Sequence, residues 1–174
     1  CMQSNTETPS TGHILGAGAL GGLWGAVLSS THPIHFIAKP GTYSHSEPFL
    51  KLSFQDLQGT QSKPRFPVEP NHSDQLPPIK KLLVFTKSYD AEQAIAGVQS
   101  RLNAESTIVL FQNGMGAQQR IAARYPDKLI YAATTTEGAY KTAGKVVHAG
   151  QGETLVGPLS IQAKQHPEQL NKLI

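Results

Sequence analysis

The chain has 174 residues, of which 39% are hydrophobic and 16% charged, so it can bury one core and is not disordered throughout. Its net charge of +3 argues against a nucleic-acid partner, and the lack of a run of about 18 apolar residues argues against a membrane span. The opening segment lacks the parts of a signal peptide. The single cysteine, Cys1, precedes Met2. We therefore expect no disulfide framework and no thiolate metal site, and we predict a cytoplasmic protein.

The first part of the sequence indicates a β-α-β unit behind a polar, flexible tail over residues 1–11. The short apolar segments 13–15 and 34–38 are typical of strands. Between them lie a glycine-rich stretch, 16–21, and a small apolar stretch, 23–28, which suits a helix packed on a sheet. This order of strand, turn, helix and strand predicts one βαβ unit.

The middle of the chain predicts more strands and a helix. Apolar residues alternate loosely over 49–69, and Gly59 marks the expected turn between two strands. The continuous apolar run 81–86 is typical of a buried parallel strand. Asp90 is then expected to cap a helix that continues to about Leu102.

The last part of the chain first continues the same alternation. Buried strands are expected at 107–111 and 129–133, with a helix over 117–124 between them, and a final helix is expected after Pro167. Short strands punctuated by glycine are expected at 138–140, 145–148 and 154–157. We predict an α/β fold: residues 12–174 form one doubly wound, mostly parallel sheet of the Rossmann type, with antiparallel strands at the C-terminal end.

The glycine-rich stretch has the spacing GxGxxG, and its position between a strand and a helix strengthens the interpretation as a dinucleotide-binding turn. Gly16 would permit the tight turn, Gly18 would let the backbone approach a pyrophosphate, and Gly21 would let the helix pack closely on the strand. A chance glycine-rich turn is the alternative. The intervening residues of the candidate site are Ala17, Ala19 and Leu20.

The end of the second strand indicates which cofactor would bind. An Asp or Glu about 20 residues after the glycine turn would accept a hydrogen bond from the ribose 2′-hydroxyl of NAD. This sequence has no acid there and carries Lys39, whose charge suits the 2′-phosphate of NADP. We therefore predict NADP, against the alternative that Lys39 is an ordinary solvated lysine.

Polar residues follow two later strands. Lys87 and Asn113 come directly after expected parallel strands, whose carboxyl ends form the ligand crevice in such sheets. The alternatives are a surface lysine and a turn-forming Asn-Gly pair. His148 could act as a general acid, although a structural role is the more ordinary one. The seven histidines are dispersed without HxxxH spacing, so no metal site is expected.

Five segments together resemble the ketopantoate reductase family in their order and spacing, from about residue 12 to residue 160. The Asn-Gly-Met-Gly and Thr-Thr-Thr pieces are more specific than the glycine motif alone. The segments are 16–21, 85–89, 112–116, 134–136 and 147–152.

The resemblance implies NADPH-dependent reduction of a small 2-keto acid, 2-dehydropantoate, to (R)-pantoate in pantothenate and coenzyme A synthesis. It implies that the glycine loop and Lys87 contact NADP and that the backbone of Ala139 lines the cofactor site. Asn113 would serve both cofactor and substrate, and Lys39 falls near the family's basic residue for the 2′-phosphate.

One departure concerns catalysis. The resemblance places the family's catalytic lysine, and a glutamate that helps to bind substrate, in a helical C-terminal domain, whereas this sequence ends at Ile174. We therefore expect no catalytic residue in these 174 residues, and no turnover by them alone. Two alternatives are a reductase of another small 2-keto acid and a non-catalytic NADP-binding module. The sequence favours no particular oligomeric state.

Overall fold

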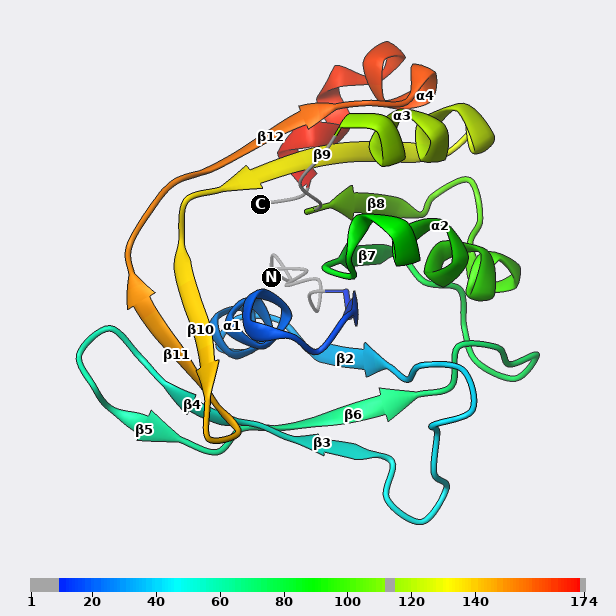
Figure 1. Ribbon diagram of the computed structural model, residues 1–174. Helices are drawn as coiled ribbons and strands as arrows, with labels where there is room; N and C mark the ends of the chain where they lie inside the picture. The colour runs from blue at the N-terminus through cyan, green and yellow to red at the C-terminus, as the bar shows by residue number, and fades with distance from the viewer. Residues whose placement is uncertain (1–9, 112–114, 173–174) are drawn as a thin grey trace, which may run out of the picture.

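The computed structural model describes residues 10–111 and 115–172, which fold into two β-sheets with helices packed between and around them (Figure 1). Asn113, one of the expected site residues, lies outside the described residues. None of the helices in the described part of the chain has the length and apolar character that crossing a membrane requires.

The main sheet has eight strands in the order β12-β9-β8-β7-β1-β2-β6-β3. Its six inner strands run parallel, and the two edge strands, β12 and β3, are antiparallel to their neighbours. The strands are β1 (Gly12–Leu15), β2 (Ile34–Ile37), β3 (Phe49–Lys51), β6 (Arg65–Glu69), β7 (Lys81–Val84), β8 (Thr107–Leu110), β9 (Leu129–Thr135) and β12 (Thr154–Pro158). The expected fold class is thereby confirmed, with an antiparallel strand at each edge rather than only at the C-terminal end.

A second sheet joins two distant parts of the chain, in the order β10-β11-β4-β5. A late hairpin consists of β10 (Gly138–Thr142) and β11 (Lys145–Gly150). Its second strand, β11, pairs in parallel with β4 (Ser53–Gln55), which is antiparallel to β5 (Gln61–Ser62). Gly59, with φ +84°, lies in the turn between β4 and β5, as expected. The late short strands therefore do not all extend the main sheet, because two of them cover its first helix instead.

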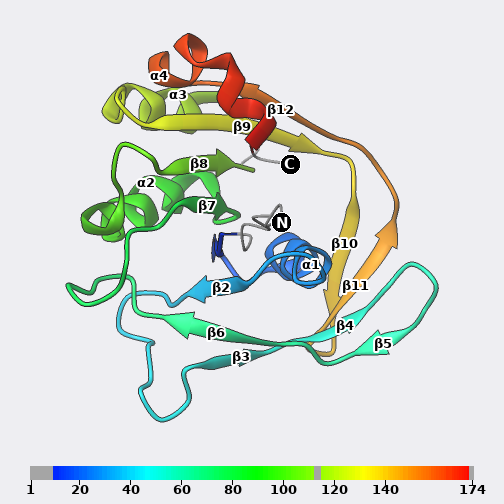
Figure 2. The same ribbon diagram turned by 180° about the vertical axis from the view of Figure 1, so that it is seen from behind.

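The helices cover both faces of the main sheet. Apolar side chains of α2 and α3 pack on one face, whereas α1 and α4 pack on the other. Helix α1 is enclosed between the two sheets, and α4 lies against β9 (Figure 2). The helical segments are α1 (Ala19–Leu28), α2 (Ser88–Gly97), α3 (Met115–Arg124) and α4 (Ile161–Gln165), with the 3₁₀ turns η1 (Gln99–Arg101) and η2 (Pro167–Lys172).

Two helix boundaries differ from the expectation. Helix α2 begins at Ser88, so Asp90 lies in its first turn and does not cap it. The negative charge of a carboxylate in this position interacts favourably with the helix dipole. The expected final helix after Pro167 is a 3₁₀ turn, and the α-helix is the earlier α4. Ser160 caps α4 by accepting a hydrogen bond from the Ala163 amide at 3.2 Å. Because the residue before a proline disfavours the α conformation, α4 ends before Pro167.

Candidate functional site

The turn between β1 and α1 is built so that only glycine fits at its two ends. Gly16 has φ +100°, and a Cβ there would lie 2.9 Å from the backbone nitrogen of Thr86. A Cβ on Gly21 would collide with the carbonyl oxygen of Gly16. These two glycines therefore hold the strand, the turn and the helix at a separation that any side chain would prevent.

Gly18 differs from the other two glycines of the motif. It is the N-cap of α1 with φ −77°, a value that any residue can adopt. No described atom lies within 4 Å of where its Cβ would be. The missing side chain thus leaves open space directly before a helix whose first amides have no intrahelical acceptor. This combination suits an anionic group such as a phosphate.

A cavity of about 350 Å³ opens beside this turn at the carboxyl ends of β1 and β2. Lys39 and Glu47 are the charged residues of its lining. The Thr42 amide and hydroxyl both donate to the carbonyl of Lys39, at 3.0 and 2.8 Å, which folds the loop after β2. Further lining residues are Gly16, Ala17, Tyr43, Asn71 and Gln93.

The expected site residues lie in three places. Gly16, Ala17 and Lys39 line this cavity, and Ala19 and Leu20 open helix α1. Lys87 is exposed at the N-cap of α2 and is not among the described residues that line the cavity. Ala139 lies on β10, where it is partly buried against the cluster containing Ile14 and Leu23.

Lys141 on β10 contacts the glycine turn in a way that the sequence did not predict. Its Nζ donates a hydrogen bond of 2.9 Å to the carbonyl oxygen of Ala17. The two residues are 124 positions apart in the chain, so no local motif signals the contact. This hydrogen bond ties the second sheet to the turn.

His148 is paired with a carboxylate that the sequence analysis missed. Its Nε2 lies 2.7 Å from Oε2 of Glu137, and both side chains are largely buried. The hydrogen bond from His148 lowers the pKa of Glu137, although burial works in the opposite direction. Glu137 directly precedes β10 and His148 lies on β11, so this pairing gives His148 a structural role.

Three aromatic side chains lie where β7 and β8 end. Phe85 and Phe111 follow these strands directly, and their rings stack with centroids 4.3 Å apart. Trp24 of α1 packs on Phe111 at 5.4 Å. They give the carboxyl edge of the sheet an apolar surface between the glycine turn and β8.

The glycine turn, the parallel order β6-β2-β1-β7-β8-β9 and the cavity at the carboxyl ends define a Rossmann-type domain of the class that binds dinucleotides. The family model described as ketopantoate reductase PanE/ApbA matches residues 13–160. The chain therefore belongs to the ketopantoate reductase family, whose members are nicotinamide-dependent reductases.

A curated relative agrees with this assignment, and solved structures share the fold. A 2-dehydropantoate 2-reductase of Vibrio cholerae is 30% identical over 149 residues, covering 84% of this chain and 47% of the relative. A probable 2-dehydropantoate 2-reductase of Bacillus subtilis has a similar fold, with TM-score 0.74, 19% identity and coverage of 94% and 54%. A D-mandelate dehydrogenase solved with NADH and anilino(oxo)acetate has TM-score 0.70, 20% identity and coverage of 94% and 53%. The chain spans about half the length of the curated relatives it matches.

Proposed function

We propose that these residues form the NADP(H)-binding part of a reductase that converts 2-dehydropantoate to pantoate. The observation that carries the proposal is the glycine turn, in which Gly16 and Gly21 exclude side chains and Gly18 opens space beside a cavity that contains Lys39. Membership of the ketopantoate reductase family supports the substrate. A chain with one cysteine also fits a reducing, cytoplasmic compartment.

The residues present fit the cofactor. The amides at the start of α1 would hold the pyrophosphate, and the cavity after β2 would hold the adenosine part. The cofactor, when bound, supplies a hydride to the keto carbon of the substrate. The backbone of Ala139, with Lys87 and Asn113, completes the proposed cofactor contacts. Asn113 is also proposed to orient the substrate.

The preference for NADP rests on the end of β2. Strand β2 ends at Ile37, and the chain continues through Ala38 to Lys39 with no carboxylate in the position that would bind a ribose 2′-hydroxyl. Lys39 is exposed on the cavity wall, where its ammonium group can meet a 2′-phosphate. Glu47 of the same lining follows later, in the loop before β3.

Titration of the 174-residue polypeptide with NADPH and NADH, followed by nicotinamide fluorescence, tests this proposal. We expect NADPH to bind more tightly. Lys39→Ala should remove most of that preference, and Lys39→Asp should weaken NADPH most, because it sets a negative charge against the 2′-phosphate. Lys51→Ala, on the edge strand β3, is the control. Equal affinities for the two cofactors, or an unchanged ratio in Lys39→Ala, would remove the proposal for NADP.

We also propose that none of these 174 residues supplies the catalytic lysine that the family resemblance implies. We therefore expect the polypeptide to bind NADPH without oxidising it in the presence of ketopantoate. General acid assistance is typically worth about 10²–10⁴-fold. Turnover near that of a full-length relative would place the acid within these residues, and His148 would be examined first.

A second candidate is reduction of another small 2-keto acid. The cofactor half described here carries few groups that would distinguish one acyl chain from another, and the neighbour solved with anilino(oxo)acetate has the same fold. A panel of 2-keto acids, assayed with a polypeptide that includes the remaining half of the relatives' length, separates the two candidates. Ketopantoate should give the highest kcat/KM under the first proposal.

A further inference from the structure

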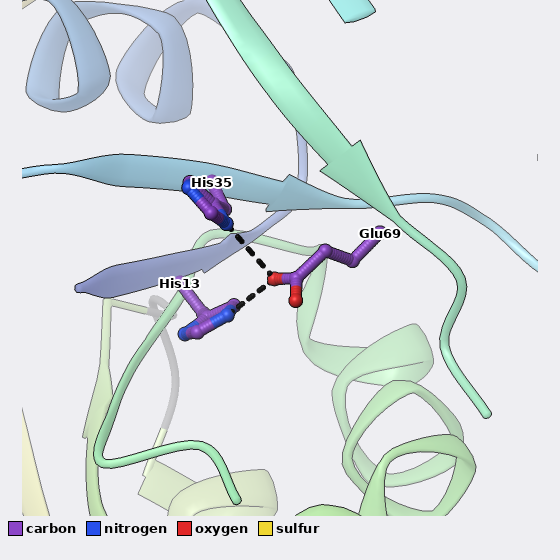
Figure 3. Close-up of side chains that lie close together, drawn as sticks. All are labelled: His13, His35 and Glu69. Carbon is purple, nitrogen blue, oxygen red and sulfur yellow. Dashed lines mark hydrogen bonds and ion pairs between the residues drawn. The ribbon is translucent and has the colours of Figure 1, made fainter. Parts of the chain in front are cut away.

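Two histidines and a glutamate converge on the face of the main sheet that α2 covers (Figure 3). His13 and His35 are direct partners in the parallel pairing of β1 with β2. Glu69, the last residue of β6, pairs with Ile37, which lies two residues beyond His35. Because alternate residues of a strand share one face, the pairing directs all three side chains to the same side.

The nitrogen and oxygen atoms of this His-His-Glu cluster are close together. His35 Nδ1 lies 3.3 Å from Glu69 Oε2, and His13 Nε2 contacts the same carboxylate oxygen. One ligand atom from each residue can be chosen so that all three lie within 4.8 Å of one another. The two imidazole rings are nearly perpendicular, with centroids 5.7 Å apart.

Two imidazoles and a carboxylate are a ligand set that zinc uses when it keeps one coordination position for water. Bonds of about 2.0–2.2 Å in a tetrahedral site place neighbouring ligand atoms roughly 3.3 Å apart. The separation between His35 and Glu69 fits this geometry, whereas His13 would move slightly away from Glu69 to admit an ion. His35, with 31% of its side chain exposed, gives access from solvent.

Arg101 binds the other oxygen of the Glu69 carboxylate. Its NH2 group donates to Glu69 Oε1 at 3.2 Å and to the carbonyl of Pro77 at 3.1 Å. The guanidinium thus occupies one carboxylate oxygen and leaves the other to face the histidines. Glu69 Oε2 is therefore the carboxylate oxygen that can serve as a ligand beside the two imidazoles. A neutral imidazole is the form that binds a metal.

His13 supplies a further indication. Only 6% of its side chain is exposed; Nε2 contacts the Glu69 carboxylate, whereas Nδ1 has no hydrogen-bond partner within the described residues. A buried polar atom normally has such a partner. The polar contact of His13 is thus with the carboxylate alongside which it would bind a metal ion.

We propose that His13, His35 and Glu69 form a binding site for a divalent transition metal of the zinc class, which links β1, β2 and β6. The site lies beneath the cofactor cavity, because Leu15, Ile37 and Asn71, two residues beyond each ligand, line that cavity. The expectation of no metal site rested on local histidine spacing. Here the ligands come together through the pairing of three strands, which the spacing of histidines in the sequence does not reveal.

Calorimetric titration of the chelator-treated 174-residue polypeptide with Zn²⁺ tests this site. A Cys1→Ser background removes the only thiol, so that it cannot bind the ion. We expect one Zn²⁺ per chain, and at least a tenfold loss of affinity in His35→Ala. His166→Ala is the matched control: His166 also pairs with a glutamate, at 3.2 Å from Glu168. Zinc binding should be unchanged in that control.

Thermal unfolding gives a second readout. Zn²⁺ should raise the Tm of the Cys1→Ser protein and of His166→Ala, and should leave the Tm of His35→Ala unchanged. His35 is partly exposed, so His35→Ala is expected to fold even if replacement of buried His13 prevents folding. Absence of zinc binding by the Cys1→Ser protein, or equal binding by His35→Ala, would overturn the proposal.

Discussion

The two ends of the strand pair β1–β2 are built in opposite ways. At the carboxyl end, the chain omits side chains: Gly16 and Gly21 bring backbone against backbone, and Gly18 leaves open space. Two residues earlier along the strands, side chains converge instead, and His13 and His35 both contact one carboxylate oxygen of Glu69. The first arrangement is encoded by one contiguous stretch of sequence, residues 16–21, whereas the second depends on the register of three strands.

The comparison predicts that backbone and side-chain sites respond differently to substitution. Within the glycine turn, Gly21→Ala should have the largest effect, since its Cβ would meet the carbonyl oxygen of Gly16, which cannot move aside as a side chain could. We expect it to cost roughly 3 kcal/mol of folding free energy or more, the upper end for overpacked positions. Urea unfolding would measure this loss, and NADPH binding should be lost with it.

Gly18→Ala is the matched control for that experiment. Its φ of −77° and its open surroundings mean that the alanine should leave folding stability within about 0.5 kcal/mol of the parent protein. The added methyl group should nevertheless weaken NADPH binding tenfold or more, because it fills the space that we propose holds the phosphates. Equal stability losses in the two variants would show that the three glycines do not have separate roles.

The His-His-Glu cluster should make stability depend on pH in the acid range. Burial tends to raise the pKa of Glu69, but the hydrogen bond from His13 and the charges of His13, Arg101 and His35 outweigh it and lower the pKa from 4.5 to about 2. A carboxyl group whose pKa is lower in the folded protein than in the unfolded chain stabilises the fold at pH values above its unfolded-state pKa. This contribution, on the order of 3 kcal/mol, is therefore lost as the pH falls from 4.5 towards 2.

Unfolding of the chelator-treated protein, measured between pH 6 and about pH 2, would detect this loss. Glu69→Gln should be less stable at neutral pH and should show a flatter profile over the same range. Glu137→Gln provides a comparison, since one histidine, together with the Gly152 amide, lowers the pKa of that carboxyl, whereas three charged side chains lower that of Glu69. An unaltered acid profile in Glu69→Gln would contradict the described charge arrangement.

The difference between the contiguous glycine turn and the cluster assembled from three strands also explains which features the sequence could predict. The GxGxxG spacing and the apolar runs predicted the turn, the parallel strands and α1, because each depends on neighbouring residues. Sequence periodicity did not predict that β11 pairs with β4 about 90 residues away, or that Glu69 meets His13, because pairing register depends on the whole sheet. Helix α4 was missed for a local reason, because it is short. It begins after its N-cap Ser160 and ends shortly before Pro167.

The smallest expected effect lies where the second sheet touches the turn. Lys141→Met removes the 2.9 Å hydrogen bond to the carbonyl of Ala17 but keeps most of the aliphatic side chain. Because Lys141 is exposed, we expect little change in stability and a two- to five-fold loss of NADPH affinity at most. Lys145→Met, which loses a 2.8 Å hydrogen bond to Gln55 within the second sheet, should not weaken NADPH.

The central claim, that the carboxyl ends of β1 and β2 hold the cofactor, is tested most directly by hydrogen exchange with and without NADPH. We predict slower amide exchange over residues 16–21 and 37–44 in the presence of NADPH. The opposite end of the sheet, where a second cavity of about 510 Å³ is lined by Lys81, Thr107 and Leu129, should show no protection. Protection confined to that second cavity, or no protection at the glycine turn, would contradict the claim.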